Sequence, residues 1–253
     1  RPEGIWLLDV DQDTLRRISD DPMLPEEAAV VVEPLGGSYT SFDGLEVPYW
    51  LFVPAGKKPE NLSVVVEIHG GPEGQERPAF NAFIQYLVSE GFAVCAPNVR
   101  GSTGYGHTYT HLDDVGKRLD SVRDIDSLVD HLIKAGIACP GKLAVSGTSY
   151  GGLSCASRYP HLWACAVDTV GMYNLVTFLE NTAEYRRHHR ESEYGTLEHD
   201  RELLFNVSPA AKIMDITAPL MVVQGRNDPR VPVTEAEQAV AALRKMGRTV
   251  EYI

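Results

Sequence analysis

The chain has 253 residues, of which 43% are hydrophobic, a composition typical of a globular domain and not of a disordered chain. Its formal net charge of −12 at pH 7 opposes binding to nucleic acid or to an anionic membrane through bulk electrostatics. No apolar stretch of the sequence reaches the roughly 18 residues that a membrane-spanning helix needs.

The first fifth of the chain is dominated by strand patterns. Residues 5–10 and 14–18 predict two short strands joined by a polar turn, which is a β-hairpin pattern. The polar, proline-containing segment 19–27 predicts a linker or a surface crossing. Further strands are expected at 30–32, 38–42 and 47–53, with Asp43-Gly44 as a hairpin turn between the last two.

From residue 64 onward, predicted strands alternate with predicted helices. The strands are expected at 64–68, 92–96, 143–145, 164–169, 220–223 and 250–253, and the helices at 79–89, 120–135, 153–158 and 233–246. The charged stretch 185–190 indicates a solvated helix. Alternation of this kind predicts a mostly parallel central sheet with helices on both faces.

The sequence Gly147-Thr148-Ser149-Tyr150-Gly151-Gly152 lies between a predicted strand and a predicted helix. A strand, a tight Gly-x-Ser-x-Gly turn and a helix form a nucleophile elbow, in which glycines leave room for a strained turn that exposes the serine hydroxyl. We therefore expect Ser149 to be a catalytic nucleophile rather than part of an inert Gly/Ser turn. Together with the leading antiparallel strands, the elbow predicts an α/β-hydrolase fold.

A serine nucleophile needs backbone donors for the oxyanion that forms when it attacks a carbonyl. His69-Gly70-Gly71-Pro72 directly follows the predicted strand 64–68, where a loop of this type supplies one N–H group in many α/β-hydrolases. The second donor is the N–H of the residue after the nucleophile. We expect these donors at Gly71 and Tyr150, and we expect His69 to be structural because it belongs to this loop.

The triad acid follows a later strand. Asp228 ends Gln224-Gly225-Arg226-Asn227-Asp228 after the strand 220–223, in the chain order serine, acid, histidine. Asp215 is a weaker candidate because it precedes that strand, and Asp168 lies inside an apolar strand, where a buried structural role is expected.

The histidine that should complete the triad is not in its expected place. No histidine follows Asp228 in the sequence, and His199 is the last of the eight. Two hypotheses arise. Either the given chain is truncated at its C-terminus and the base lies beyond Ile253, or His188, His189 or His199 reaches Ser149 and acts as the base. The first is favoured, because these histidines lie in or near the charged segment.

Four cysteines, Cys95, Cys139, Cys155 and Cys165, form no CxxC pair. Their apolar or small-residue surroundings predict buried free thiols in a reducing compartment, and no signal peptide is visible.

The residues described so far resemble the prolyl oligopeptidase family of serine peptidases, especially its acylaminoacyl-peptidase-like branch. The resemblance covers about residues 38 to 253 and rests on five segments in family order. These are Ser41-Phe42-Asp43-Gly44, His69-Gly70-Gly71-Pro72, the glycine-rich run from Asn98 to Gly106, the elbow, and the run from Gly225 to Pro232. The glycine-rich run itself is expected to be structural.

The resemblance implies Ser149 as nucleophile, Asp228 as acid, and Gly71 and Tyr150 as oxyanion donors. It also implies that Arg230, two residues after the acid, binds a substrate backbone carbonyl through the fixed geometry of its guanidinium donors. The alternative for Arg230 is a surface salt bridge. Val231 would lie near the pocket for the side chain that precedes the cleaved bond, whose other residues between Gly171 and Phe178 are not assignable.

The family also carries a β-propeller before the hydrolase domain. We therefore expect residues 1–34 to be the end of a propeller and a linker, and residues 35–253 to be a catalytic domain whose C-terminal part is missing. A chain truncated at both ends, without the histidine, would be a poor catalyst.

The resulting expectation is a serine peptidase that hydrolyses short peptides through an acyl-enzyme on Ser149, releasing acylated or free N-terminal residues. The alternatives are a carboxylesterase of the same fold and a non-catalytic hydrolase-like protein. No metal, organic cofactor, nucleic acid or membrane partner is expected. A cytoplasmic location is expected, and self-association into a homo-oligomer is left open.

Overall fold

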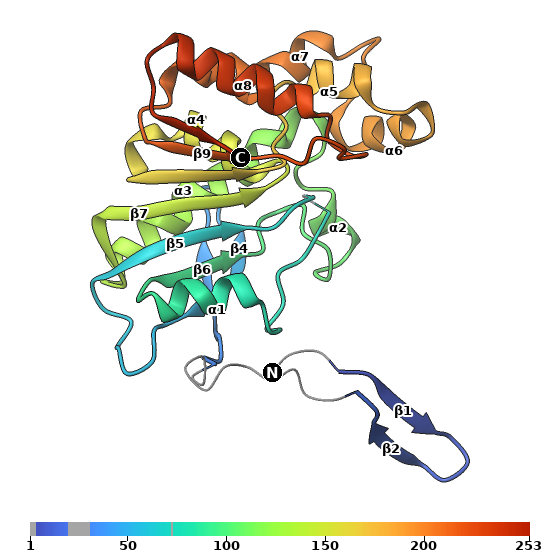
Figure 1. Ribbon diagram of the computed structural model, residues 1–253, viewed down its shortest axis with the longest axis vertical. Helices are drawn as coiled ribbons and strands as arrows, with labels where there is room; N and C mark the ends of the chain where they lie inside the picture. Colours follow the sequence, from blue (N-terminus) through green and yellow to red (C-terminus); the bar gives the residue numbers. More distant parts are fainter. Residues whose placement is uncertain (1–3, 20–30, 72) are drawn as a thin grey trace.

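A computed structural model describes residues 4–19, 31–71 and 73–253 of the protein (Figure 1). In these ranges the main sheet has the strand order β10-β9-β8-β7-β5-β6-β4-β3. Its strands are β3 (Leu35–Thr40), β4 (Glu46–Phe52), β5 (Leu62–Ile68), β6 (Ala93–Pro97), β7 (Ala138–Thr148), β8 (Cys165–Thr169), β9 (Leu220–Val223) and β10 (Val250–Tyr252). The α-helices are α1 (Ala82–Ser89), α2 (His107–Thr110), α3 (Arg118–Lys134), α4 (Gly151–Arg158), α5 (Leu175–Asn181), α6 (Glu184–Tyr194), α7 (Arg201–Val207) and α8 (Val233–Lys245). Short 3₁₀ helices lie at η2 (Val115–Lys117), η3 (Pro160–Leu162) and η4 (Pro209–Asp215).

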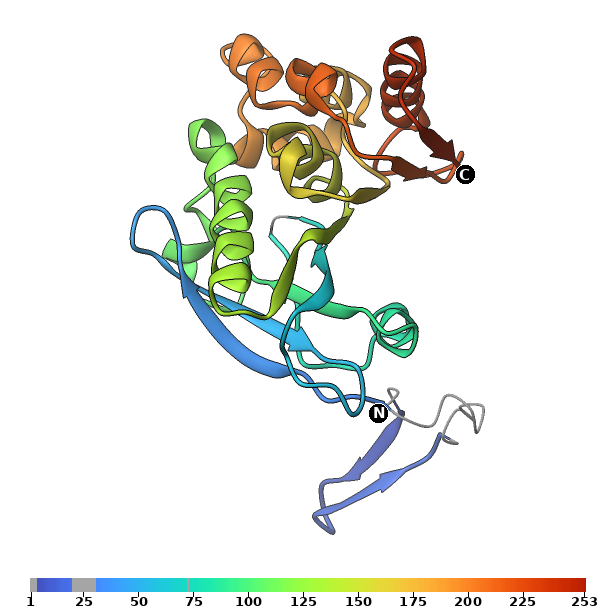
Figure 2. The same cartoon turned by 90° about the vertical axis from the view of Figure 1, so that its left-hand side faces the viewer.

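The sheet is parallel from β6 to β10, and only β3 and β4 run antiparallel to their neighbours. Helices cover both of its faces: Figure 2 shows α1 and α8 on one side and α3 and α4 on the other. The strands are consequently buried from both sides, and all five residues of β6 are buried. The predicted mostly parallel sheet between two helical layers is confirmed.

Parallel strands place their carboxyl ends at one edge of the sheet, which is where loops of α/β folds carry functional groups. The loops that follow β5, β7, β8 and β9 therefore gather at this edge. They contain His69 to Gly74, the elbow, Val170 to Asn174, and Gln224 to Pro232.

A separate hairpin pairs β1 (Trp6–Asp9) with β2 (Thr14–Arg17), as predicted. Both views show it apart from the main sheet (Figures 1 and 2), and Trp6, Leu8 and Leu15 are all more than half exposed. The predicted linker at 19–27 lies almost entirely outside the described residues. No helix in the described ranges has the length and apolar character needed to cross a bilayer.

Two expectations of local structure are wrong. Val31 and Val32 are not in a strand, and Val30 is outside the described residues. The backbone of Val32 is instead satisfied by the Gln85 side chain of α1, which accepts from its N–H and donates to its carbonyl, each at 3.0 Å.

Cys165 is exposed rather than buried, because it is the first residue of β8, and Cys139 is only half-buried. Cys95 and Cys155 are buried, and all four thiols are free.

Candidate active site

Ser149 occupies a sharp turn between β7 and α4. Its φ of 66° lies in the left-handed region, which a residue with a side chain adopts only when the surroundings hold it there. The Ser149 N–H donates to the Thr169 carbonyl at 2.8 Å, and the Ser149 carbonyl accepts from the Met172 N–H at 2.9 Å. The backbone of the predicted nucleophile is thus fixed to the end of β8.

The glycines around Ser149 are required by close packing. A Cβ atom on Gly147 would lie 2.2 Å from the Gly152 nitrogen, and one on Gly151 would lie 2.5 Å from Cγ2 of Ile68. The first contact is with a backbone atom, so a side chain at Gly147 would force the strand and the helix apart. The predicted reason for glycine at these positions therefore holds in the structure.

The loop after β5 lies directly beside the elbow. An added Cβ on Gly70 would be 3.7 Å from the Ser149 Cβ, and Gly71 has a φ of 140° that favours glycine. Within the described ranges, neither the Gly71 N–H nor the Tyr150 N–H donates to a backbone carbonyl. Their role as oxyanion donors stays a prediction.

His69 has both ring nitrogens engaged. Its Nε2 is 2.9 Å from the Ser102 hydroxyl and its Nδ1 is 3.0 Å from the Gly70 carbonyl oxygen. Burial lowers the pKa of His69, which disfavours the charged ring. These contacts agree with the expected structural role.

Asp228 lies in the loop after β9, half-buried, with its carboxylate orientation fixed. Its Oδ1 accepts from the N–H groups of Arg230 at 2.7 Å and Val231 at 3.0 Å. Among the described residues, the other oxygen, Oδ2, forms no hydrogen bond or ion pair. The rival Asp215 is exposed in η4, 3.6 Å from Lys212, and Asp168 is buried and accepts from the Leu153 N–H.

Arg230 is exposed, and among the described residues its guanidinium forms no hydrogen bond or ion pair. The alternative of a surface salt bridge is therefore not seen. Val231 is buried, and its carbonyl accepts from the Gln224 side chain at 3.1 Å.

In the described part of the chain, the Ser149 hydroxyl has no histidine partner. His188, His189 and His199 are exposed, and their only side-chain contacts of an ionic kind are those of His188 with Glu191 and of His199 with Glu198. The last residue, Ile253, pairs with Val222 and Gln224 of the strand and loop that lead to Asp228. In the described ranges, no cluster of three histidine, cysteine, aspartate or glutamate side chains could hold a metal ion.

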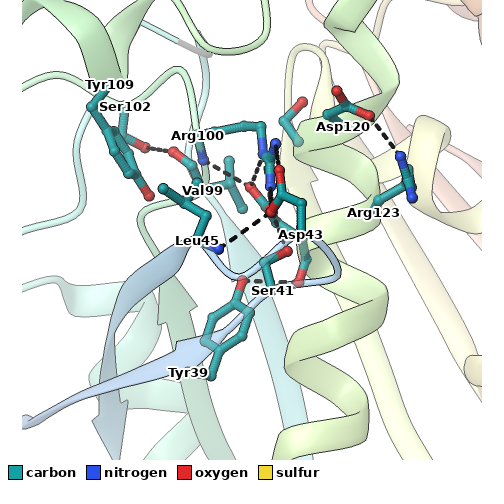
Figure 3. Close-up of polar contacts among 12 residues, drawn as sticks. Tyr39, Ser41, Asp43, Leu45, Val99, Arg100, Ser102, Tyr109, Asp120 and Arg123 are labelled. Atoms are coloured by element: carbon teal, nitrogen blue, oxygen red, sulfur yellow. Dashed lines mark hydrogen bonds and ion pairs between the residues drawn. The ribbon is translucent and has the colours of Figure 1, made fainter.

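The glycine-rich loop after β6 is hydrogen-bonded to the loop that contains Gly71. Figure 3 shows its Arg100, which is 3% exposed, with the guanidinium paired to Asp43. The same guanidinium donates to Asp124 of α3, so the loop is tied to the β3–β4 turn and to a core helix. Further along, the Thr103 N–H donates to the Gly74 carbonyl at 2.8 Å, which braces the loop that contains Gly71. These contacts give the loop the structural role expected for it.

Sequence patterns did not single out one buried cluster beneath the elbow, formed by Asp113, Arg118, Glu193 and Tyr194. Its members come from three separate segments: the loop before η2, the start of α3, and the end of α6. Helices were expected at 120–135 and at 185–190, but neither predicted range includes these four residues. The second of these helices extends to Tyr194, and its last two residues are buried rather than solvated. No local signal reveals this, because the contacts that bury them come from elsewhere in the chain.

Comparison with known proteins agrees with this geometry. The model of the prolyl oligopeptidase family matches residues 78–253. The chain is 33% identical over 221 residues to dipeptidyl peptidase family member 6 of Caenorhabditis elegans, covering 79% of the chain and 30% of that protein. It is 32% identical over 209 residues to dipeptidyl aminopeptidase BIII of Pseudoxanthomonas mexicana, covering 78% of the chain and 30% of that protein. The chain thus spans about a third of the length of these relatives.

Among solved structures, a puromycin-hydrolyzing peptidase of Mycobacterium tuberculosis superposes with a TM-score of 0.87 at 26% identity, over 100% of the chain and 39% of that protein. An acylaminoacyl peptidase of Pyrococcus horikoshii also has a TM-score of 0.87, over 100% of the chain and 41% of that protein, at 23% identity. The second likeness shows the fold, and the predicted α/β-hydrolase fold is confirmed. With a family match over more than half of its length, and with the elbow and the loops of Gly71 and Asp228 at one edge of the sheet, this chain belongs to the prolyl oligopeptidase family.

Proposed function

We propose that residues 35–253 form the main part of a serine peptidase domain that cleaves short peptides and releases acylated or free N-terminal residues. The observation that carries this proposal is the elbow: Ser149 is held at a φ of 66° beside two backbone N–H groups that have no backbone partner among the residues the structure describes. Such an arrangement suits attack on a carbonyl carbon whose oxygen becomes negatively charged.

In the proposed reaction, a histidine takes the proton of the Ser149 hydroxyl as its oxygen bonds to the substrate carbonyl carbon. The N–H groups of Gly71 and Tyr150 stabilise the oxyanion, and Asp228 orients the imidazole through its free Oδ2. The histidine then protonates the leaving amine, and water hydrolyses the acyl-enzyme by the same steps. Arg230 would hold a substrate backbone carbonyl, with Val231 lying beneath the adjoining pocket.

Peptide substrates are supported by the relatives, which are named as dipeptidyl peptidases, a dipeptidyl aminopeptidase and acylamino-acid-releasing enzymes. The free thiols support the cytoplasmic location that belongs to this proposal. We further propose residues 1–34 as a separate β segment with its linker. No strand of the β1–β2 hairpin pairs with the main sheet in the described ranges.

The test is fluorophosphonate labelling, read by intact mass and by the labelled peptide. It is applied to the natural gene product that carries residues 1–253, to residues 1–253 alone, and to Ser149→Ala forms of both. We expect a stoichiometric adduct on Ser149 in the gene product and none in the Ser149→Ala forms. An adduct on residues 1–253 alone would mean that these residues supply a base. A gene product that folds and takes up no label would contradict the proposal.

Hydrolysis separates the peptidase from an esterase. The gene product is compared on an acyl-amino-acid anilide and on a simple p-nitrophenyl ester. Turnover of the anilide that Arg230→Ala reduces supports the peptidase, whereas turnover of the ester alone contradicts it.

A further inference from the structure

The carbonyl of Gly71 is held by a residue that lies far away in the sequence. The Tyr194 hydroxyl, at the end of α6, donates to the Gly71 oxygen at 3.0 Å. Tyr194 is 1% exposed, and its ring packs edge-on against Phe178 of α5, with centroids 6.3 Å apart. Glycine has the freest backbone of all residues, so an external hydrogen bond is needed to keep the Gly71 peptide planes in one orientation.

The second predicted donor, Tyr150, is held by the same group of residues. The Arg118 guanidinium carbon lies 4.5 Å from the Tyr194 ring centroid and 5.5 Å from the Tyr150 ring centroid. The Tyr150 hydroxyl also forms a hydrogen bond with the Ser121 hydroxyl, and the Ser121 O–H donates to the Arg118 carbonyl oxygen. Arg118 thus lies against both tyrosines.

Arg118 is in turn fixed by charged partners. It donates to Asp113 Oδ2 and to the Glu193 carbonyl, both at 2.9 Å, and all three residues are at most 3% exposed. Three polar atoms of this group, Arg118 Nε, Asp113 Oδ1 and Glu193 Oε1, have no hydrogen-bond partner within the described ranges. Arg118 also forms an ion pair with Glu193 Oε1 at 3.6 Å. A buried ion pair whose hydrogen bonds are incomplete gives less stability than a well-packed apolar core, so stability alone gives little reason for this cluster.

We propose that Arg118 and Tyr194 are positioning residues for the oxyanion site, with the Tyr194 hydroxyl setting the Gly71 peptide and Arg118 keeping Tyr150 and Tyr194 in register. This inference rests on the proposed function of Ser149, Gly71 and Tyr150. Neither residue contacts the reacting atoms. They act by aligning the N–H groups of Gly71 and Tyr150 with the negative charge that develops on the substrate oxygen. Through Tyr194, the end of α6 is connected to the site.

The test compares a matched pair of substrates, an acyl ester and its thionoester, in which sulfur replaces the carbonyl oxygen. Sulfur is a weak hydrogen-bond acceptor, so the thionoester gains less from oxyanion donors than the ester does. The ratio of kcat/KM for ester over thionoester therefore reports on donor alignment. It is measured in the gene product that carries residues 1–253, in Tyr194→Phe and in Arg118→Lys.

We expect Tyr194→Phe to lower kcat/KM for the ester about 10-fold and the thionoester about twofold, so that the ratio falls about fivefold, since loss of a whole oxyanion donor costs about 10²–10³-fold. Arg118→Lys keeps the charge but not the planar fork, and we expect the ratio to fall there also. The matched control is Tyr39→Phe, which removes a buried hydroxyl that donates to the Asp124 carbonyl at 2.9 Å, beside Arg100. Its ratio should equal that of the wild type.

An unchanged ratio in a folded, reactive Tyr194→Phe variant would overturn the positioning role and leave the proposed function intact. A wild-type gene product that reacts with neither ester nor fluorophosphonate would contradict the proposed function itself, and this inference with it. A fall of similar size in Tyr39→Phe would show a general effect of lost stability and would also overturn the positioning role.

Discussion

At Gly147, the close packing of β7 against α4 leaves room for glycine only. Its missing Cβ would lie 2.2 Å from the Gly152 nitrogen, a backbone atom that cannot move without shifting α4. We expect Gly147→Ala to lower the free energy of unfolding by about 3 kcal/mol, the upper end of ordinary overpacking. Urea denaturation measures this change. Gly116→Ala is the control, since a Cβ there meets nothing within 4 Å. Equal stability of the two variants would contradict the packing argument.

Asp43 gives a residue-scale prediction that depends on pH. Hydrogen bonds from Arg100 lower the pKa of Asp43 to about 2 in the folded state, below the unfolded value of about 3.9. A lowered carboxyl pKa stabilises the fold above pH of about 4, and this contribution is lost as the pH falls toward 2. Because the Asp43 side chain is 42% exposed, the contribution is discounted for solvent screening to about 1 kcal/mol.

Asp43→Asn should therefore unfold about 1 kcal/mol more easily than the wild type at pH 6, with a smaller difference at pH 3. Urea midpoints at the two pH values measure this. Asp120→Asn, which removes a half-buried partner of the exposed Arg123 at 3.0 Å, should stay within about 0.5 kcal/mol of the wild type at both. A difference for Asp43→Asn that grows on acidification would show the sign to be wrong.

At the scale of elements, one buried carboxylate joins α8 to α5. Glu235, which is inaccessible to solvent, accepts from the Asn174 N–H at 2.8 Å and from the Thr177 hydroxyl at 2.6 Å. Asn174 is the N-cap of α5, and α8 begins just after the Asp228 loop. The bond therefore fixes the elements on either side of the site.

Glu235→Ala should lower the free energy of unfolding by about 2–3 kcal/mol, because it leaves the Asn174 N–H buried without its charged acceptor. Glu237→Ala, on the exposed side of the same helix, should change it by no more than about 0.5 kcal/mol. Thermal and urea unfolding of the two variants test the difference. Equal effects would mean that the Glu235 bonds contribute nothing to the joining of α5 and α8.

Helices and strands with their own periodic pattern could be predicted from the sequence, and those held by distant contacts could not. The helix α3 carries an apolar face of Val122, Ile125, Leu128, Val129 and Leu132, and it was predicted to within two residues. The helices α5 and α7 have seven residues each, too few for a repeating face. Their position depends instead on Ser208, whose hydroxyl accepts from the Leu175 N–H and donates to the Leu204 carbonyl.

The same division applies to the site. Ser149, Asp228 and the Gly71 loop lie in short motifs whose glycines report backbone constraints, so the sequence alone could point to them. Arg118 and Tyr194 do not lie in a recognisable sequence motif, because their proposed role depends on tertiary contacts with Tyr150 and Gly71. Their separation along the chain is what prevents any local pattern from pairing them.

For the molecule as a whole, the central sheet contains a buried carboxyl group on an interior strand, β8. Asp168 of β8 is 1% exposed, between the glycines at 152 and 171, and burial raises its pKa to about 7. The folded pKa exceeds the unfolded value of about 3.9, so the folded state holds a proton that the unfolded state has released. Its contribution to stability is present below pH of about 4 and is lost as the pH rises to about 7, with a slope of at most about 1.4 kcal/mol per pH unit.

An asparagine at this position keeps the shape and an acceptor for the Leu153 N–H, which Asp168 binds at 3.1 Å, but it never ionises. Relative to the wild type, we expect Asp168→Asn to gain about 3 kcal/mol of unfolding free energy between pH 5 and pH 8. Urea unfolding at pH 5, 6.5 and 8 measures this gain. Glu251→Gln removes a charge from an exposed position on β10 and should follow the wild-type profile. Parallel profiles for Asp168→Asn and the wild type would mean that the carboxyl is ionised in the folded state throughout this range, and that the sheet accommodates its charge.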